Sequence, residues 1–388
     1  MPQLRFRGLN NRADPVMVKP GTLTAALNVD LDNQSALSVR GGFSLFLSGA
    51  SLCAAYATQD GSRLFVVDSG SLLELFSDGS SAVLAAGFVD GNYYWCEAGE
   101  MVFVSGPVKA VIRGQVVRSW GIPVPAQPQV KVYDGSLPAG RYLIASCLTA
   151  ADGRRGGIST PVEVALEANG RLQLTLPQVG GYQTSVFVSS TNGSDLYYLD
   201  TTSQSALSWD GPLSLLTSPV DEAQVGAFPP PDAARVVEFH DGRVWLAEYL
   251  PDRAATVLWR SSQFWPDLFR LADDYDMVAG EVRMLQSTAN GLLVGTDSRI
   301  ILYGDQGITT LVSGGVQFGA KQHLSHTGER ALWALDGMYS GDDLEPKTSS
   351  DVEPDKGKAC SSVIIETGTA DRMLVSVKRG GRTENPYG

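Results

Sequence analysis

The chain repeats one short arrangement of polar and apolar positions: a polar turn, an apolar strand, a small residue and a second apolar strand. The arrangement is found at residues 60–76, 99–112 and 290–303, and more loosely at Gly242, Gly328 and Asp371. Asp-Gly and Asn-Gly pairs separate many of the strands, and such pairs adopt the positive φ angles that tight hairpins need. The pattern predicts an all-β chain built mostly from antiparallel hairpins.

The repeat has a measurable spacing. Its early apolar positions are Leu64, Met101, Val244, Leu292, Leu332 and Leu374, separated by 37, 143, 48, 40 and 42 residues. Blades of a β-propeller are four-stranded sheets that recur every roughly 40–50 residues. Four of the steps lie in or near this range, so the spacing predicts a β-propeller of about six blades.

The long step indicates an inserted domain. Proline-rich segments bound it at residues 121–128 and 228–232, and proline cannot join a central strand. Between them, short apolar strands alternate in the manner of a sheet with one buried face. About seven such strands predict an inserted immunoglobulin- or fibronectin-like β-sandwich. The expected organisation is an N-terminal arm and first blades at 1–123, the sandwich at 124–230 and the remaining blades at 231–388.

Composition and charge argue against several classes of function. The 388 residues are 43% hydrophobic and 19% charged, as in folded proteins, and the net charge of −12 has no long run of either sign. Proteins that grip nucleic acid need clustered Lys and Arg, so this balance argues against such a role. No apolar stretch reaches the roughly 20 residues of a membrane span, and the N-terminus lacks an apolar secretory segment. We therefore expect synthesis in a cytoplasm.

Candidate chemistry is sparse. His323 and His326 have a metal-like spacing, but in a strand they point to opposite faces. The acidic segments 273–276 and 341–345 resemble solvated loop tips, and the four cysteines lie far apart in apolar strands. No Gly-x-Ser-x-Gly elbow or phosphate loop is present, whereas a Ser-His-Asp arrangement has no fixed spacing and stays open. The sequence predicts no catalytic residue, no metal site, no cofactor and no enzyme.

Two groups of motifs resemble bacteriophage proteins. Residues 7–11, 27–32 and 36–43 resemble the opening of many phage virion proteins, with Gly41 where that pattern has proline. Residues 258–262, 291–296 and 300–304 are similar to the central blades of short-tailed phage nozzle proteins, also called packaged-DNA stabilisation proteins. The residues that match these motifs, to which the resemblance gives a structural role, are Asn10, Asn11, Asn28, Asp30, Arg40, Gly42, Gly295 and Thr296.

The resemblance implies a structural virion protein of the phage tail. Nozzle proteins form a hexameric propeller ring below the portal adaptor, continue the DNA channel, retain and release the genome and carry tail fibres or a tip. DNA passes through such a lumen without sequence-specific binding, and the sandwich would decorate the outside of the ring. Because this chain is shorter than familiar nozzle proteins, a tail-tip or baseplate protein beside the tail tube of a long-tailed phage is an alternative. A carbohydrate-binding or depolymerising propeller is the rival class, and cleavage needs two carboxylates about 5–10 Å apart.

Overall fold

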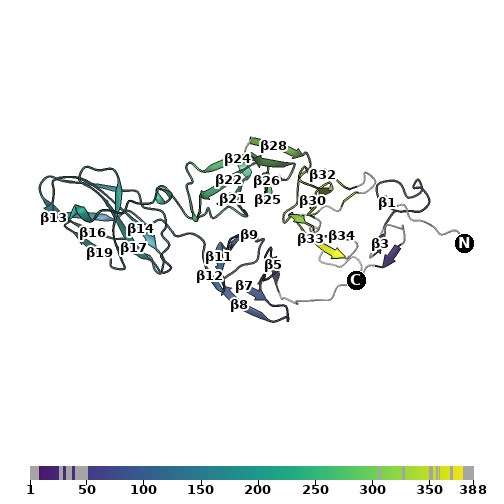
Figure 1. The fold of residues 1–388 in the computed structure, drawn as a ribbon, viewed down its shortest axis with the longest axis horizontal. Helices are drawn as coiled ribbons and strands as arrows, with labels where there is room; N and C mark the ends of the chain where they lie inside the picture. The colour runs from purple at the N-terminus through teal and green to yellow at the C-terminus, as the bar shows by residue number, and fades with distance from the viewer. Residues whose placement is uncertain are drawn as a thin grey trace. The chain divides into compact units, whose positions relative to one another are not determined.

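The computed structural model describes residues 8–25, 29–31, 37–39, 51–304, 307–325, 328–348, 353–354, 357, 359–367 and 370–378. In these residues the chain forms 34 strands and three 3₁₀ helices of a single turn (Figure 1). The predicted all-β class is confirmed. No helix in the described ranges is long and apolar enough to cross a membrane.

Contacts divide the chain into two compact units, one of residues 53–73 and 83–279 and one of residues 1–52, 74–82 and 280–388. Antiparallel sheets of consecutive strands recur along the sequence. The first is β5 (Leu52–Ala57), β6 (Leu64–Asp68), β7 (Ser71–Leu75) and β8 (Ser81–Ala86). The second is β9 (Tyr94–Ala98), β10 (Met101–Ser105), β11 (Ala110–Arg113) and β12 (Val116–Ser119). The third is β20 (Val236–His240), β21 (Arg243–Leu250) and β22 (Ala255–Ser262), with β23 (Trp265–Phe269) and β24 (Tyr275–Ala279) both paired to β22.

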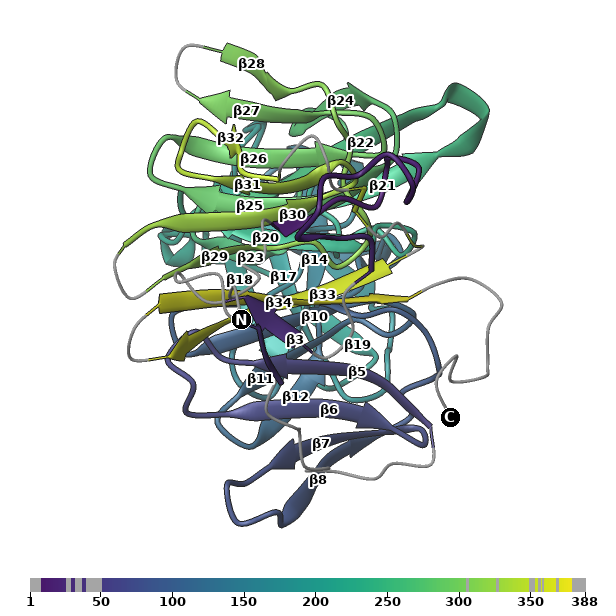
Figure 2. The ribbon, with the colours of Figure 1, turned by 90° about the vertical axis from the view of Figure 1, so that its right-hand side faces the viewer.

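The unit that contains residues 280–388 continues the same pattern. One sheet is β25 (Val282–Thr288), β26 (Gly291–Thr296), β27 (Ile300–Gly304) and β28 (Gly307–Val312), which lie side by side in this order in Figure 2. The next is β29 (Gln322–Leu324), β30 (Arg330–Ala334), β31 (Gly337–Ser340) and β32 (Glu345–Pro346). A hairpin follows, β33 (Ala359–Thr367) and β34 (Ala370–Lys378). Two short pairs precede them in sequence, β1 (Gly8–Leu9) with β2 (Thr22–Leu23) and β3 (Val29–Leu31) with β4 (Leu37–Val39).

The sequence repeat has one structural meaning. Each of its marker residues lies in the second strand of its sheet or hairpin. The strands that hold them are β6, β10, β21, β26, β30 and β34. A central strand must present apolar side chains on both faces and follows a tight turn, which is why this position carries the clearest signal.

The sheet β9–β12 shows how such sheets pack. Along β10, Val102 and Val104 join a buried cluster with Phe65 and Trp95. The intervening Phe103 joins a different cluster, with residues of the sheet β20–β24 such as Leu246. Successive residues of a strand point to opposite faces, so this sheet is buried on both sides. Burial on both faces is the condition of a blade that has a neighbour on each side.

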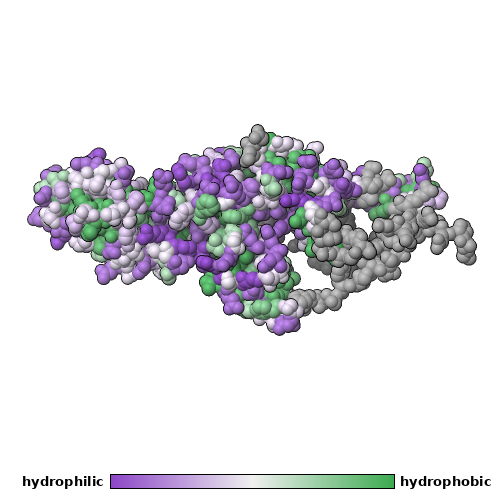
Figure 3. Space-filling model, in the orientation of Figure 1, coloured by the Kyte–Doolittle hydropathy of each residue, from purple (hydrophilic) through white to green (hydrophobic). Residues whose placement is uncertain are grey.

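Residues 129–209, which belong to the first of these compact units, form two sheets with a buried cluster of their own (Figure 1). One sheet has the order β13 (Gln129–Leu137), β16 (Gly170–Thr175) and β19 (Ala206–Trp209). The other has the order β15 (Val162–Leu166), β14 (Gly140–Thr149), β17 (Gln183–Ser189) and β18 (Leu196–Thr202). One buried cluster takes residues from both sheets, including Tyr142, Leu172, Val186 and Trp209. We call this body the two-sheet module; hydrophilic and hydrophobic residues are interspersed on its visible face (Figure 3).

The segment after the module returns the chain to the sheets. It contains the single-turn helices η1 (Leu213–Leu215) and η2 (Glu222–Gln224), and η3 (Pro251–Arg253) follows later, between β21 and β22. The side chain of Asp221 accepts a hydrogen bond from the Ala223 backbone N–H at 2.9 Å, which caps η2. Gln224 is buried, and its Nε2 donates to the Gly156 carbonyl at 2.8 Å. The bond from Gln224 holds η2 against the loop between β14 and β15 of the two-sheet module.

Candidate functional site

The N-terminal motif forms a turn at Asn10 and a pair of hydrogen bonds between Asn11 and the Glu353 backbone, which we call the clasp. The side-chain oxygen of Asn10 accepts hydrogen bonds from the backbone N–H groups of Arg12, at 3.2 Å, and Ala13, at 3.0 Å. Asn11 donates its Nδ2 to the Glu353 carbonyl at 3.1 Å and accepts the Glu353 N–H on its Oδ1 at 2.7 Å. A side-chain amide paired in this way replaces one step of a backbone ladder. Asn11 thus joins the start of the chain to a segment 342 residues later.

The second motif lies at the end of β26. Thr296 is fully buried, its hydroxyl donates to the Arg299 carbonyl at 3.0 Å, and it accepts the backbone N–H of Arg299 at 3.0 Å. A Cβ on Gly295 would lie 2.6 Å from Val316 Cγ2 and 3.1 Å from Met284 Cβ, so the position requires glycine. Both residues serve the turn and the packing around it. Of the other motif residues, Asp30 lies in β3, and Asn28, Arg40 and Gly42 lie outside the described residues.

A buried ion cluster joins the two-sheet module to two of the sheets. Asp267 of β23 has a side chain only 12% exposed. Arg118 of β12 binds it through two parallel hydrogen bonds, Nη1 to Oδ1 at 3.0 Å and Nη2 to Oδ2 at 3.2 Å. Arg154, from the loop between β14 and β15, adds Nη1 to Oδ2 at 3.2 Å, and the Gly121 N–H donates to Oδ1 at 3.2 Å. Both carboxylate oxygens are satisfied, which is the requirement for a stable buried charge. We call this group the Asp267 cluster.

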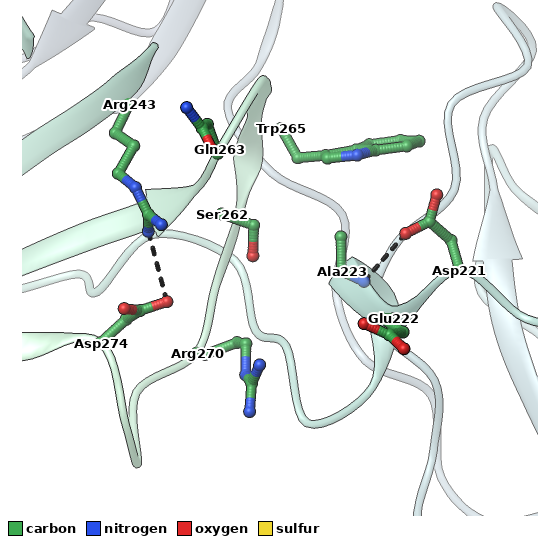
Figure 4. A pocket seen from close by; sticks show the side chains of 9 residues that line it. All are labelled: Asp221, Glu222, Ala223, Arg243, Ser262, Gln263, Trp265, Arg270 and Asp274. Carbon is green, nitrogen blue, oxygen red and sulfur yellow. Dashed lines mark hydrogen bonds and ion pairs between the residues drawn. The ribbon is translucent and has the colours of Figure 1, made fainter. Parts of the chain in front are cut away.

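A polar pocket lies beside the same strand. It has a volume of about 300 Å³ and is lined by Asp221, Glu222, Ala223, Arg243, Ser262, Gln263, Trp265, Arg270 and Asp274. Figure 4 shows residues 221–223 on one side, the Arg243–Asp274 pair on the other, and Ser262 between them. The strands β21, β22 and β23 therefore supply one wall, and the turn at η2 supplies the opposite wall. We call this the Ser262 pocket.

Most charged groups of the Ser262 pocket already have partners. Arg243 Nη1 lies 3.4 Å from Asp274 Oδ2 and donates to the Ser261 carbonyl at 3.1 Å. Arg270 forms an ion pair with the exposed Asp273 at 2.7 Å. With two guanidinium groups and three carboxylates in its lining, the pocket is close to electrically balanced.

In contrast to these paired charged groups, the hydroxyl of Ser262 is buried and unpaired among the described residues. Its side chain is part of a residue only 8% exposed, and its hydroxyl has no hydrogen-bond partner among the described residues. Buried polar groups in folded proteins are almost always paired. Ser262 is the one residue of the pocket lining with such an unpaired atom.

His323 and the four cysteines have structural surroundings. His323 lies in β29, where its Nε2 is 2.9 Å from the Ser362 hydroxyl, and burial lowers its pKa. His326 lies outside the described residues. All four cysteines are free, and burial raises the pKa of the Cys147 and Cys360 thiols to about 11. Within the described ranges, no group of three or more His, Cys, Asp or Glu residues is placed to hold a metal ion.

The prediction that residues 273–276 form a solvated loop tip is wrong in part. Asp273 is exposed, but the side chain of Asp274 is 27% exposed and is paired with Arg243 and Arg260. Tyr275 and Asp276 belong to β24. A local run of acids does not reveal an arginine that a neighbouring strand brings beside it, so the sequence missed both the ion pairs and the pocket.

No protein-family model matches the chain, and no curated protein matches it. Solved structures show distant likenesses. The dipeptidyl peptidase 4 of Porphyromonas gingivalis is 10% identical with a TM-score of 0.28, over 80% of this chain and 40% of that chain. PorZ, a surface component of the type-IX secretion system of the same organism, is 11% identical with a TM-score of 0.19, over 81% and 49%. The gluconolactonase XC5397 of Xanthomonas campestris is 11% identical with a TM-score of 0.25, over 74% and 84%. The chain thus spans less than half the length of the first two, and at these values the likenesses assign no function.

Proposed function

We propose that the protein is a structural, non-enzymatic component of a bacteriophage tail. In this proposal its sheets form a β-propeller of about six blades, and copies of the chain assemble into a nozzle-type hexameric ring that continues the DNA channel. The observation that carries the proposal is the Asp267 cluster. It fixes the two-sheet module to the sheets with three charged side chains and a backbone donor. A wall segment that must hold an attached domain in a constant position needs a junction of this kind.

The propeller and its inserted domain draw on further observations. Sheets of consecutive strands recur at the spacing of blades, and the sheet β9–β12 is buried on both faces. In the two-sheet module, the order β18-β17-β14-β15 matches the order G-F-C-C′ of an immunoglobulin-type sheet, with β13 and β16 in the places of strands B and E. We therefore assign 1–123 to the arm and first blades, 124–230 to an immunoglobulin-like sandwich and 231–388 to the remaining blades.

The proposed partners follow from this placement. The ring would contact the portal adaptor above it and fibre or tip proteins below it, in the tail of the virion after synthesis in the host cytoplasm. A tail-tip position in a long-tailed phage would replace the adaptor with a tail-tube protein. The net charge of −12 supports a lumen past which DNA moves without sticking, because like charges repel the phosphates.

Assembly and location test the proposal directly. Native mass spectrometry and negative-stain electron microscopy of the purified full chain should show a closed ring. Immunogold labelling with an antibody against the two-sheet module should then mark the tail of the particles that encode the protein. A chain that stays monomeric at micromolar concentration and is missing from purified particles contradicts the proposal. Hydrolysis of a host polysaccharide by the purified chain contradicts its non-enzymatic part.

A further inference from the structure

We propose that the Ser262 pocket binds one ring of a neutral saccharide. This inference does not depend on the phage-tail proposal, because it rests only on the residues that line the pocket. They come from one compact unit and lie within 54 consecutive positions of the chain, from Asp221 to Asp274. Four features support it: an unpaired buried hydroxyl, an exposed indole, a mixture of donors and acceptors, and a balanced charge.

The first feature is the unpaired hydroxyl of Ser262, which both lines the pocket and lacks a partner among the described residues. Ser262 ends β22, and its Cα pairs with that of Trp265 across the hairpin, so the backbone holds the hydroxyl in place. Figure 4 shows this hydroxyl directed into the space between Arg270 and the turn at Ala223. A serine hydroxyl donates one hydrogen bond and accepts others. A ligand hydroxyl reproduces both functions, whereas a carboxylate or phosphate uses only the donor.

The indole of Trp265 provides a flat apolar surface, here called the plate, on which a ring can stack. Trp265 is 39% exposed, although large aromatic side chains gain most from burial. Figure 4 shows its ring extended along the edge of the pocket, from the Ser262 wall toward Asp221. A pyranose ring has an apolar face of C–H groups and a rim of hydroxyls. Stacking that face on the indole would remove apolar surface of both partners from water.

The remaining groups suit the rim of such a ring. Gln263 offers both a donor and an acceptor, Arg270 offers donors on the lower side, and Glu222 offers acceptors opposite them. Arg243 and Asp274 already satisfy one another, which leaves little net positive charge to attract an anion. Donors and acceptors in near balance favour a neutral polyhydroxylated ligand over a phosphate, a sulfate or an acidic peptide.

The size of the pocket limits the ligand. A volume of about 300 Å³ is at the lower end of the range for small-molecule sites. One pyranose ring fits this space better than an oligosaccharide. The affinity expected for one ring on an open polar site is weak, with a Kd of about 1–10 mM.

The test uses the full chain and four probes: the methyl glycosides of glucose, galactose, mannose and N-acetylglucosamine. Saturation-transfer NMR detects binding, and titration to about 30 mM gives the Kd. Sodium glucuronate serves as the anionic comparison. The variants are Trp265→Ala, which removes the plate, and Ser262→Ala, which removes the hydroxyl. Tyr275→Ala is the matched control, since Tyr275 is 41% exposed on the neighbouring strand and does not line the pocket.

We expect saturable binding of at least one neutral glycoside. Trp265→Ala should weaken it about tenfold or more and Ser262→Ala about threefold to tenfold, with Tyr275→Ala unchanged. Circular dichroism and the Tm of each variant verify that it is folded. Absence of saturable binding by all four glycosides overturns the inference. So does equal binding by the Trp265→Ala variant, or binding of glucuronate alone that is lost in salt. The oligomeric state is recorded separately, so a failed ring and a failed subsite are distinguishable.

Discussion

The Asp267 cluster and the Ser262 pocket lie five residues apart on the same hairpin, and they treat polar groups in opposite ways. At Asp267, a mostly buried carboxylate receives four hydrogen bonds from two arginines and a backbone N–H. At Ser262, a buried hydroxyl receives none from the described residues. The first arrangement is complete within the chain. In our proposal, the second is completed by a ligand.

The difference distinguishes polar groups that stabilise the fold from polar groups that are available to a ligand. Short, well-aligned hydrogen bonds and ion pairs are not by themselves evidence of a binding site, because a fully paired cluster has no group left to bind a ligand. The Asp267 cluster has more interactions than the Ser262 pocket, but both carboxylate oxygens are already bonded to groups that join the two-sheet module to the sheets. The Ser262 pocket is modest, yet it retains an unpaired group that is held in a fixed position.

Removing the central carboxylate is the most severe test of this contrast. Asp267→Ala removes the counter-charge of Arg118 and leaves Arg154 only its pair with Asp152 at 2.7 Å, and the two arginine side chains are 18% and 26% exposed. We expect the free energy of unfolding to fall by about 2–4 kcal/mol, somewhat less than for a fully dry pair because water reaches the arginines. Urea denaturation measures the loss. The control is Glu100→Ala, which breaks the exposed pair with Arg113 and should cost less than about 0.5 kcal/mol. Equal losses in the two variants would contradict the structural role of the cluster.

Lys109 extends the contrast to a partly buried cation that has no carboxylate bound to it among the described residues. Its Nζ donates to the carbonyls of Ala234 at 2.5 Å and Asp232 at 3.3 Å, and burial lowers the pKa of Lys109 from 10.5 to about 8. Between pH 8 and pH 10.5, Lys109 is protonated in the unfolded chain and has lost its proton in the folded chain. Stability supplied by this residue therefore rises with pH across that window and is constant below it.

The measurable form of this prediction is a difference between two proteins. The unfolding free energy of the natural chain, minus that of Lys109→Met, should increase by about 1–2 kcal/mol between pH 8 and pH 10. Other groups that titrate there, such as the Cys147 and Cys360 thiols, are present in both proteins and cancel in the difference. A difference that stays flat over this range would show that Lys109 keeps an ordinary pKa.

Trp120 tests whether the junction depends on neutral hydrogen bonds as well as charge. Its indole Nε1 donates to the Pro266 carbonyl at 2.8 Å, next to Asp267, and its ring packs 5.0 Å from that of Phe103. Trp120→Phe keeps an aromatic ring and removes the donor. We expect a loss of about 1 kcal/mol in the free energy of unfolding, smaller than that of Asp267→Ala. A larger loss than Asp267→Ala would place the main strength of the junction in packing and not in the ion cluster.

Local pattern predicted the sheets well, for a physical reason. The marker residues fall in second strands because such strands combine a preceding tight turn with apolar side chains on both faces, and both signals are contiguous in sequence. The alternating leucines of residues 172–176 predicted a strand with one buried face in the same way. Residues 129–209 form two such sheets, and their assignment as an inserted domain stays a proposal.

The sites could not be predicted, because their members are distant in sequence. Arg118 and Asp267 are 149 positions apart, and no periodicity connects them. Asp274 stands in a run of acids that suggested solvent, and only the register of neighbouring strands places Arg243 beside it. The clasp between Asn11 and Glu353 is equally non-local. The motif indicated a structural role for Asn11 by resemblance, but not its partner.

Ser262→Ala is expected to have the smallest effect on stability, and the direction of that effect is the informative part. If the hydroxyl had a partner, its removal would lower the free energy of unfolding by about 1 kcal/mol. Because it has none among the described residues and is 92% buried, its removal relieves an unpaired polar group and should leave stability unchanged or raise it by up to about 0.5 kcal/mol. Urea denaturation of Ser262→Ala beside Ser261→Ala provides the comparison, since the Ser261 hydroxyl accepts the Val244 N–H at 2.9 Å and donates to the Ser262 carbonyl at 3.2 Å. Of these two adjacent serines on one strand, only Ser261 should then lower the free energy of unfolding when it is replaced by alanine. A Ser262→Ala protein of undiminished stability with weakened saccharide binding would identify this hydroxyl as one that serves a ligand and not the fold.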